Sequence, residues 1–130
     1  MQEPFELGKQ PIIALIATRD PERARKFYRD TLGLRLVLDQ LPFALVFDAN
    51  GTMLRVTPVK ELNPPGYSVL AWDVRDIVHA VRALEKAGVR FERYPGMEQD
   101  DLGIWTAPDG AARVAWFKDP DGNTLGISQH

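Results

Sequence analysis

The side chains that could do chemistry in this chain are few and scattered. There is no cysteine among the 130 residues, which excludes disulfides, thiolate catalysis and cysteine-based zinc sites. We expect both histidines in solvent, because His79 shares the polar face of a predicted helix and His130 ends the sequence. The acidic run at 98–101 lacks the alternating spacing of a calcium loop. No glycine-rich phosphate loop or serine nucleophile elbow is present either.

Large aromatic side chains are the more informative group, since ligand cups are mostly apolar with a few placed polar groups. Trp105 and Tyr94 flank a polar stretch at 95–101 and could form a lid or a stacking wall. Packing in the core or at a subunit interface accounts for most aromatic residues in any domain. We favour packing for Trp72 and Phe43 and leave both roles open for Trp105. Two further large rings are Tyr67 and Trp116.

An internal repeat determines where these side chains lie. Residues 48–56 (DANGTMLRV) align without a gap on residues 119–127 (DPDGNTLGI). Upstream of each copy, an apolar strand leads to an Asp that can cap a helix, and an amphipathic helix ends at Gly. The strands are 11–17 and 69–74, the caps Asp20 and Asp76, and the closing glycines Gly33 and Gly88.

Further strands complete each half. They are predicted at 34–39, 43–47 and 52–59, and at 112–117 and 124–128, with tight turns at Asn50-Gly51 and 120–122. Strands are also predicted at 89–94 and 102–106, although residues 89–107 fit either two strands or one bent strand and a lid. The pattern predicts an α+β fold in one domain, 1–130. Module one covers about 10–60, the linker 61–67 and module two about 68–129; a ferredoxin-like sandwich is the alternative.

Three motifs resemble the vicinal oxygen chelate superfamily, which includes glyoxalase I, bleomycin-resistance proteins and extradiol dioxygenases. Residues 18–28 (TRDPERARKFY) with 32–34 (LGL) resemble its first-helix signature. Residues 84–89 (LEKAGV) resemble the end of its second helix, and 117–123 (FKDPDGN) its closing signature. The resemblance covers 10–129 and implies two paired βαβββ modules whose curved sheets form a cup, commonly in a homodimer.

The resemblance also implies four positions where metal-dependent members hold a divalent ion. They map to Ile13, Arg55, Val69 and Gly126, on the first and last strand of each module. Ile and Val offer no lone pair, Gly has no side chain, and the positive charge of Arg repels a cation. Divalent ions in enzymes need imidazole or carboxylate ligands. We therefore expect no metal and no other cofactor.

Arg55 is the leading candidate for chemistry inside such a cup. A guanidinium among apolar side chains needs a carboxylate, supplied either by a ligand or by the protein. The internal alternatives are an ion pair with Asp73 or Asp48, or a strand slip that turns Arg55 outward. Asp73 could be a general base or the partner of Arg55, and Ser128 a hydrogen-bond donor. The candidate ligand-binding set is Ile13, Leu15, Arg55, Val69, Asp73, Tyr94, Trp105 and Ser128.

Four functions stay open at this point. The preferred one is a metal-free protein that binds a small, partly aromatic, anionic molecule, as the bleomycin-resistance branch sequesters its ligand. The others are a metal-independent isomerase, lyase or hydrolase that uses Arg55 and Asp73, a surface interaction module whose cup is filled, and a metal-dependent glyoxalase or dioxygenase if the register of the four positions is wrong.

The composition limits partners and location. A net charge of -2 gives no electrostatic footprint for nucleic acid or an anionic membrane. Residues 1–6 lack the basic and then apolar pattern of a signal peptide, and no apolar run reaches membrane-spanning length. We expect a cytoplasmic protein with a small-molecule ligand.

Overall fold

A computed structural model describes residues 3–130, and its first half forms one βαβββ unit. After a short turn, η1 (Leu7–Lys9), the unit consists of β1 (Ile13–Thr18), α1 (Pro21–Lys26), the π-helical turn η2 (Phe27–Thr31), β2 (Arg35–Gln40), β3 (Ala44–Ala49) and β4 (Thr52–Pro58). The sheet order is β1-β4-β3-β2, with β1 parallel to β4 and the other pairs antiparallel.

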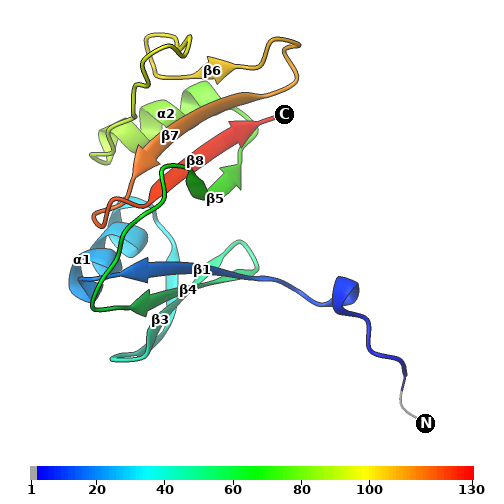
Figure 1. The fold of residues 1–130 in the computed structure, drawn as a ribbon, viewed down its shortest axis with the longest axis vertical. Helices are drawn as coiled ribbons and strands as arrows, with labels where there is room; N and C mark the ends of the chain where they lie inside the picture. The colour runs from blue at the N-terminus through cyan, green and yellow to red at the C-terminus, as the bar shows by residue number, and fades with distance from the viewer. Residues whose placement is uncertain (1–2) are drawn as a thin grey trace.

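The second half repeats this arrangement. It contains β5 (Ser68–Asp73), α2 (Ile77–Lys86), β6 (Trp105–Thr106), β7 (Arg113–Lys118) and β8 (Thr124–Gln129), in the sheet order β5-β8-β7-β6. Figure 1 shows the two sheets with β1 and β5 as the edges nearest each other. The predicted α+β fold of two paired βαβββ modules is confirmed, and the ferredoxin-like alternative has too few strands.

Local sequence explains where the helices begin. Asp20 accepts a hydrogen bond from the Arg23 amide at 3.2 Å, and Asp76 accepts one from the His79 amide at 3.1 Å. These carboxylates satisfy amides that have no partner inside the helix. Both predicted caps are therefore present, and each helix starts directly after its parallel edge strand. Within residues 3–130, neither helix has the length and apolarity needed to cross a bilayer.

The region 89–107 differs from the prediction. The expected strand at 89–94 is absent except for an isolated bridge between Phe91 and Phe117, and the expected strand at 102–106 shrinks to β6. The physical reason is that the Gln99 side chain hydrogen-bonds to the backbone of Glu92, Tyr94 and Gly103. Those groups would otherwise be available for a neighbouring strand, so the segment folds as a loop.

A set of polar contacts, which we call the seam, joins the two units. The buried Asp119 carboxylate accepts hydrogen bonds from the Tyr28 hydroxyl at 2.7 Å and the Asn123 amide nitrogen at 2.8 Å. Asp121 accepts from the Thr18 hydroxyl at 2.5 Å, and Asn123 also donates to the Ala17 carbonyl at 2.9 Å. The closing turn of the second unit is thus bonded to the β1–α1 region of the first.

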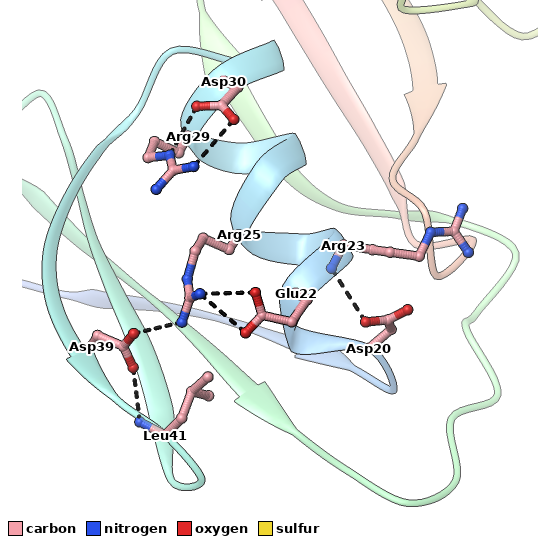
Figure 2. A network of polar contacts seen from close by, with 8 residues as sticks. All are labelled: Asp20, Glu22, Arg23, Arg25, Arg29, Asp30, Asp39 and Leu41. Carbon is pink, nitrogen blue, oxygen red and sulfur yellow. Dashed lines mark hydrogen bonds and ion pairs between the residues drawn. The ribbon is translucent and has the colours of Figure 1, made fainter.

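An ion-pair network fixes α1 on its own sheet (Figure 2). The Arg25 guanidinium contacts the Glu22 carboxylate at 2.8 Å and the Asp39 carboxylate of β2 at 2.5 Å. Asp39 also accepts a hydrogen bond from the Leu41 amide at 3.2 Å. Arg25 therefore links the helix to the β2–β3 hairpin, whereas the nearby Arg29–Asp30 pair joins sequence neighbours only.

Candidate functional site

The first sheet has one face toward the core and one open face. Side chains alternate along a strand, so Ile16, Leu54 and Val56 are buried while their neighbours point the other way. On this open face Ile13 is 46% exposed and Leu15 is 63% exposed. In the strand register Leu15 of β1 lies beside Arg55 of β4, and Val46 of β3 lies on the other side of Arg55.

Arg55 is half-buried on this face and has no ion-pair partner among residues 3–130. Its contact is a weak one, from Nη2 to the Met53 sulfur at 3.9 Å. The expected alternative of an internal pair with Asp48 is wrong, because Asp48 faces Arg35 at 3.6 Å and accepts from the Gly51 amide at 3.0 Å. The outward slip is also wrong, since Arg55 shares its face with Leu15. The guanidinium is therefore free to meet an anion.

Asp73 does not serve as the partner of Arg55. It lies at the end of β5 with a side chain 84% exposed, and its carboxylate is 3.7 Å from His130 Nδ1. Ser128 also meets this histidine, at 3.4 Å from Nε2. His130 thus lies near two candidate residues, and its side chain is 66% exposed, as we expected for this histidine. An Arg55–Asp73 acid–base pair is not assembled in this chain.

On the open face of the second sheet, Gly126 is a position without a side chain, and neighbouring groups cover it. The strand register places Ala71 of β5 and Trp116 of β7 on either side of it. A Cβ at Gly126 would meet Trp116 Cδ1 at 3.4 Å and the Ser68 hydroxyl oxygen at 3.5 Å. The absent side chain therefore lets the Trp116 ring approach the strand. Val69 lies on the same exposed side of β5.

Three rings, which we call the aromatic wall, gather over this face. Trp116 contacts Tyr94 edge-to-face, with ring centroids 5.7 Å apart, and Trp105 at 6.4 Å. Burial and the nearby Glu92 carboxylate raise the pKa of Tyr94, so its phenol stays protonated at neutral pH. The structure thus brings the candidates Tyr94 and Trp105 together around a third ring.

Two hollows adjoin the wall and share Tyr94 and Met97. One, of about 310 Å³, lies on the sheet face and is lined by Gly66, Tyr67, Ser68, Tyr94, Met97, Trp116 and Thr124. The other, of about 800 Å³, lies under the loop and is lined by 94–100, 104–106 and Pro108. Sequence reasoning did not assign Trp116 or Met97 to a site. The hairpin pattern could have predicted Trp116 as a neighbour of Gly126, because both residues lie five positions from the turn residue Asp121 and pair across the hairpin.

Trp72 and Phe43, for which the sequence favoured packing, differ in burial. Trp72 is half-buried and stacks on the buried Phe117 at 6.5 Å, as core packing requires. Phe43, for which we favoured packing, is 79% exposed in the turn between β2 and β3. The strand that buries Leu45 and Phe47 begins at Ala44, so Phe43 lies outside it.

The residues present do not fit a divalent metal ion. The four positions that the resemblance maps are Ile13, Arg55, Val69 and Gly126, and none of these residue types offers a carboxylate or imidazole ligand. In the part of the chain that the structure describes, no three His, Cys, Asp or Glu side chains come close enough to hold an ion. The open faces of the two sheets present a guanidinium and apolar side chains on the first, and aromatic rings on the second.

Comparison with known proteins identifies the family. The profile of the Glyoxalase/Bleomycin resistance protein/Dioxygenase superfamily matches residues 11–127. The chain belongs to this superfamily. No curated protein sequence matches this superfamily member significantly.

Solved structures of the same superfamily share the fold at low identity. A glyoxalase family protein from Bacillus anthracis has a TM-score of 0.72 at 18% identity, over 100% of this chain and 99% of that one. A lactoylglutathione lyase from Agrobacterium tumefaciens has a TM-score of 0.72 at 17%, over 95% and 96%. A superfamily member from Sphaerobacter thermophilus has a TM-score of 0.70 at 27%, over 93% and 97%. These likenesses bear on the fold, and the activity must be argued from the site.

Proposed function

We propose that this superfamily member binds a small, partly aromatic, anionic molecule without a metal ion and sequesters it. The observation that carries the proposal is Arg55, a half-buried guanidinium on an open sheet face with no carboxylate partner among the described residues. A planar guanidinium binds a carboxylate with two parallel hydrogen bonds, and apolar surroundings strengthen that attraction.

The aromatic wall supports the other half of the proposal. Tyr94, Trp105 and Trp116 offer flat apolar surfaces, beside a hollow of about 310 Å³. An aromatic ring packs favourably against such side chains in offset or edge-to-face geometry. The proposed ligand contacts are Arg55, Leu15 and Ile13 on the first sheet, and Val69 with the wall on the second.

We also propose a cytoplasmic homodimer of single-domain chains. The open face of the first sheet leaves Ile13, Leu15, Val37 and Met53 substantially exposed, and clustered apolar exposure of this kind is typical of an interaction surface. A second copy laid over this face would cover these side chains and could enclose the ligand. The lack of cysteine fits a reducing compartment.

The enzymatic alternatives have less support. A metal-independent isomerase or lyase would need Asp73 near Arg55, whereas Asp73 is exposed and contacts His130. A metal-dependent glyoxalase or dioxygenase would need ligands at four positions that offer none.

Titration with benzoate, an aromatic carboxylate, tests the proposal. We expect Arg55→Met to weaken benzoate binding about 10- to 100-fold, since a hydrogen bond to a charged group contributes about 1.5–3 kcal/mol. Arg35→Met is the matched control, because Arg35 lies on β2 with a side chain 72% exposed, and it should bind benzoate as the unmodified protein does. Equal affinities in all three proteins would contradict the role of Arg55.

Native mass spectrometry of the unmodified protein tests the remaining parts. We expect a dimer mass with no divalent ion and, where a ligand co-purifies, an added small-molecule mass. One divalent ion per chain would refute the metal-free assignment, and a monomer at working concentration would refute the dimer.

A further inference from the structure

The loop between α2 and β6 is built around one side chain, Gln99. Its amide nitrogen donates to the Glu92 carbonyl at 2.9 Å and to the Gly103 carbonyl at 2.8 Å. Its amide oxygen accepts from the Tyr94 amide at 2.8 Å. One half-buried side chain therefore bonds both the segment at 92–94, where the loop begins, and Gly103, where the loop ends.

Other contacts also hold the loop together. The Asp100 carboxylate accepts from the Leu102 and Ile104 amides, each at 2.9 Å. The Arg93 guanidinium donates to the carbonyls of Asp100 and Asp101. The Asp100 bonds shape residues 100–104, and the Arg93 bonds join this tip to residue 93. Gln99 adds a bond to the Tyr94 amide itself and links it to the carbonyls of residues 92 and 103.

The bonds of Gln99 lead directly to the aromatic wall. Its amide oxygen holds the backbone of Tyr94, and its own backbone forms an antiparallel bridge with Trp105. The third ring, Trp116, is held independently because β7 pairs with β8 along its length. Two of the three rings are thus positioned by Gln99 against a ring that the sheet positions.

The same bonds also fix the boundary between the two hollows. Tyr94 and Met97 line both the hollow of about 310 Å³ on the sheet and the hollow of about 800 Å³ under the loop. Met97 lies in the sequence between Tyr94 and Gln99, whose hydrogen bond closes this part of the loop. The Met97 amide donates to the Tyr94 carbonyl at 3.2 Å. If Tyr94 moved, the two hollows would merge.

We infer that Gln99 is a positioning residue: it holds Tyr94 and Trp105 against Trp116 and thereby limits the length of aromatic ligand that the sheet hollow accepts. This inference rests on the proposed function for its ligand. The ligand that this limit implies carries one compact ring, because a longer ring system would have to displace Tyr94 and Met97. Loss of the Gln99 bonds would relax this limit.

The test compares Gln99→Met with Gln129→Met. Methionine keeps the length of the side chain and removes its hydrogen bonds. Gln129 is a matched control, because its amide oxygen accepts from the Ile77 amide at 2.8 Å, in the same unit but away from the wall. Each protein is titrated with benzoate and with biphenyl-4-carboxylate, and its near-ultraviolet circular dichroism is recorded.

We expect the unmodified protein and Gln129→Met to bind benzoate more tightly than biphenyl-4-carboxylate, with the same aromatic dichroism. In Gln99→Met we expect the preference to fall about 10-fold or more, corresponding to about 1.4 kcal/mol, and the dichroism of the coupled rings to weaken. An unchanged preference and an unchanged spectrum in Gln99→Met would overturn the inference.

Amide hydrogen exchange on the unmodified protein gives a second test that needs no variant and no ligand. We expect the Tyr94 amide to be protected from exchange like the amides of β8, because Gln99 holds it. Rapid exchange at Tyr94 would overturn the positioning role. If neither carboxylate binds the unmodified protein, the proposed function and the limit on ligand length fail, while exchange and dichroism still decide the positioning of the rings.

Discussion

At the scale of single residues, Tyr28 and Arg55 show two ways of placing a polar group among apolar ones. Tyr28 is fully buried, and its hydroxyl donates to the Asp119 carboxylate. Burial, and then the nearby Asp119 charge, raise the pKa of Tyr28 far above its ordinary value of 10.0. Arg55 has no carboxylate partner among residues 3–130. The first group contributes to stability, and the second leaves a charge for a ligand.

Stability should therefore fall in alkali because of Tyr28. Above pH 10 the unfolded chain loses the phenol proton while the folded chain keeps it, so the unfolded state binds fewer protons and the free energy of unfolding decreases as pH rises. Below pH 10 this contribution is fully present. Urea unfolding of the unmodified protein at pH 7 and at pH 10.5 measures the difference.

The variant Tyr28→Phe separates this effect from the titration of other groups. We expect it to lower the free energy of unfolding at neutral pH by about 1–3 kcal/mol, because Asp119 loses a donor, and to reduce the alkaline loss. Tyr67→Phe, at a 69% exposed tyrosine, should match the unmodified protein. An alkaline loss that is as large in Tyr28→Phe as in the unmodified protein would refute the assignment.

Metal ions should leave stability unchanged, because the four family positions carry no ligand side chains. A specific site filled at 1,000 times its dissociation constant would add about 4 kcal/mol to the free energy of unfolding. Thermal unfolding with EDTA, and then with Zn²⁺, Ni²⁺ or Mn²⁺, should give one midpoint. A midpoint that rises with metal concentration and returns with EDTA would contradict this expectation.

At the scale of elements, α1 is held by both apolar and ionic contacts. Tyr28 and Phe27 in the turn that continues it pack on Phe47 and Phe117, while Arg25 joins the helix to Asp39 of β2. The Arg25 side chain is only 19% exposed, so water screens this pair less than a fully exposed one. The ionic contact fixes where the β2–β3 hairpin lies against the helix.

Two carboxylates on the same side of the molecule test this role. We expect Asp39→Asn to lower the free energy of unfolding by about 0.5–1 kcal/mol, since partly exposed pairs contribute little. Asp30→Asn should have no measurable effect, because Asp30 is exposed and pairs only with its neighbour Arg29. Urea unfolding at low and high salt measures both, and equal effects would contradict the helix–hairpin role of Arg25.

The elements that the sequence predicted are those with a repeating local signal. The strands at 13–18, 44–49, 113–118 and 124–129 follow apolar runs, and both helix starts follow a capping Asp. For residues 89–107 the sequence predicted either two strands or one bent strand and a lid, because Val89, Phe91 and Tyr94 resemble a strand in composition. The hydrogen bonds of the Gln99 side chain to the backbone of residues 92, 94 and 103 replace strand pairing there. The positions that these bonds join have no periodic spacing, so the sequence alone gives no signal for them. The contact of Asp73 with His130 was missed for the same reason.

At the scale of the whole molecule, the two units share one core. Buried side chains from both sheets and both helices form a continuous cluster, and Phe27 of the first unit lies 6.5 Å from Phe117 of the second. The seam adds hydrogen bonds across the same boundary, in which Asp119 and Asp121 accept and Asn123 donates. We expect the units to unfold together.

Leu54→Ala tests this coupling, because Leu54 is a fully buried residue of the first unit while all three tryptophans lie in the second. Removing a buried leucine side chain costs about 2–5 kcal/mol. We expect the tryptophan fluorescence midpoint in urea to fall together with the midpoint from circular dichroism. A fluorescence midpoint that stays unchanged while the dichroism midpoint falls would show that the units unfold separately.

The seam has a consequence for how far the two similar halves of the chain can replace each other. Its residues in the second copy, Asp119, Asp121 and Asn123, correspond to Asp48, Asn50 and Thr52 in the first. There Asp48 contacts Arg35 and accepts from the Gly51 amide, both within the first unit. On the other side, Thr18 and Tyr28 correspond to Val74 and Leu84. Two copies of the second half would lack Thr18 and Tyr28. Two copies of the first half would lack Asp121 and Asn123, so neither combination would form the whole seam. Recombination that replaces one half of the gene must therefore bring in a half already matched to the other.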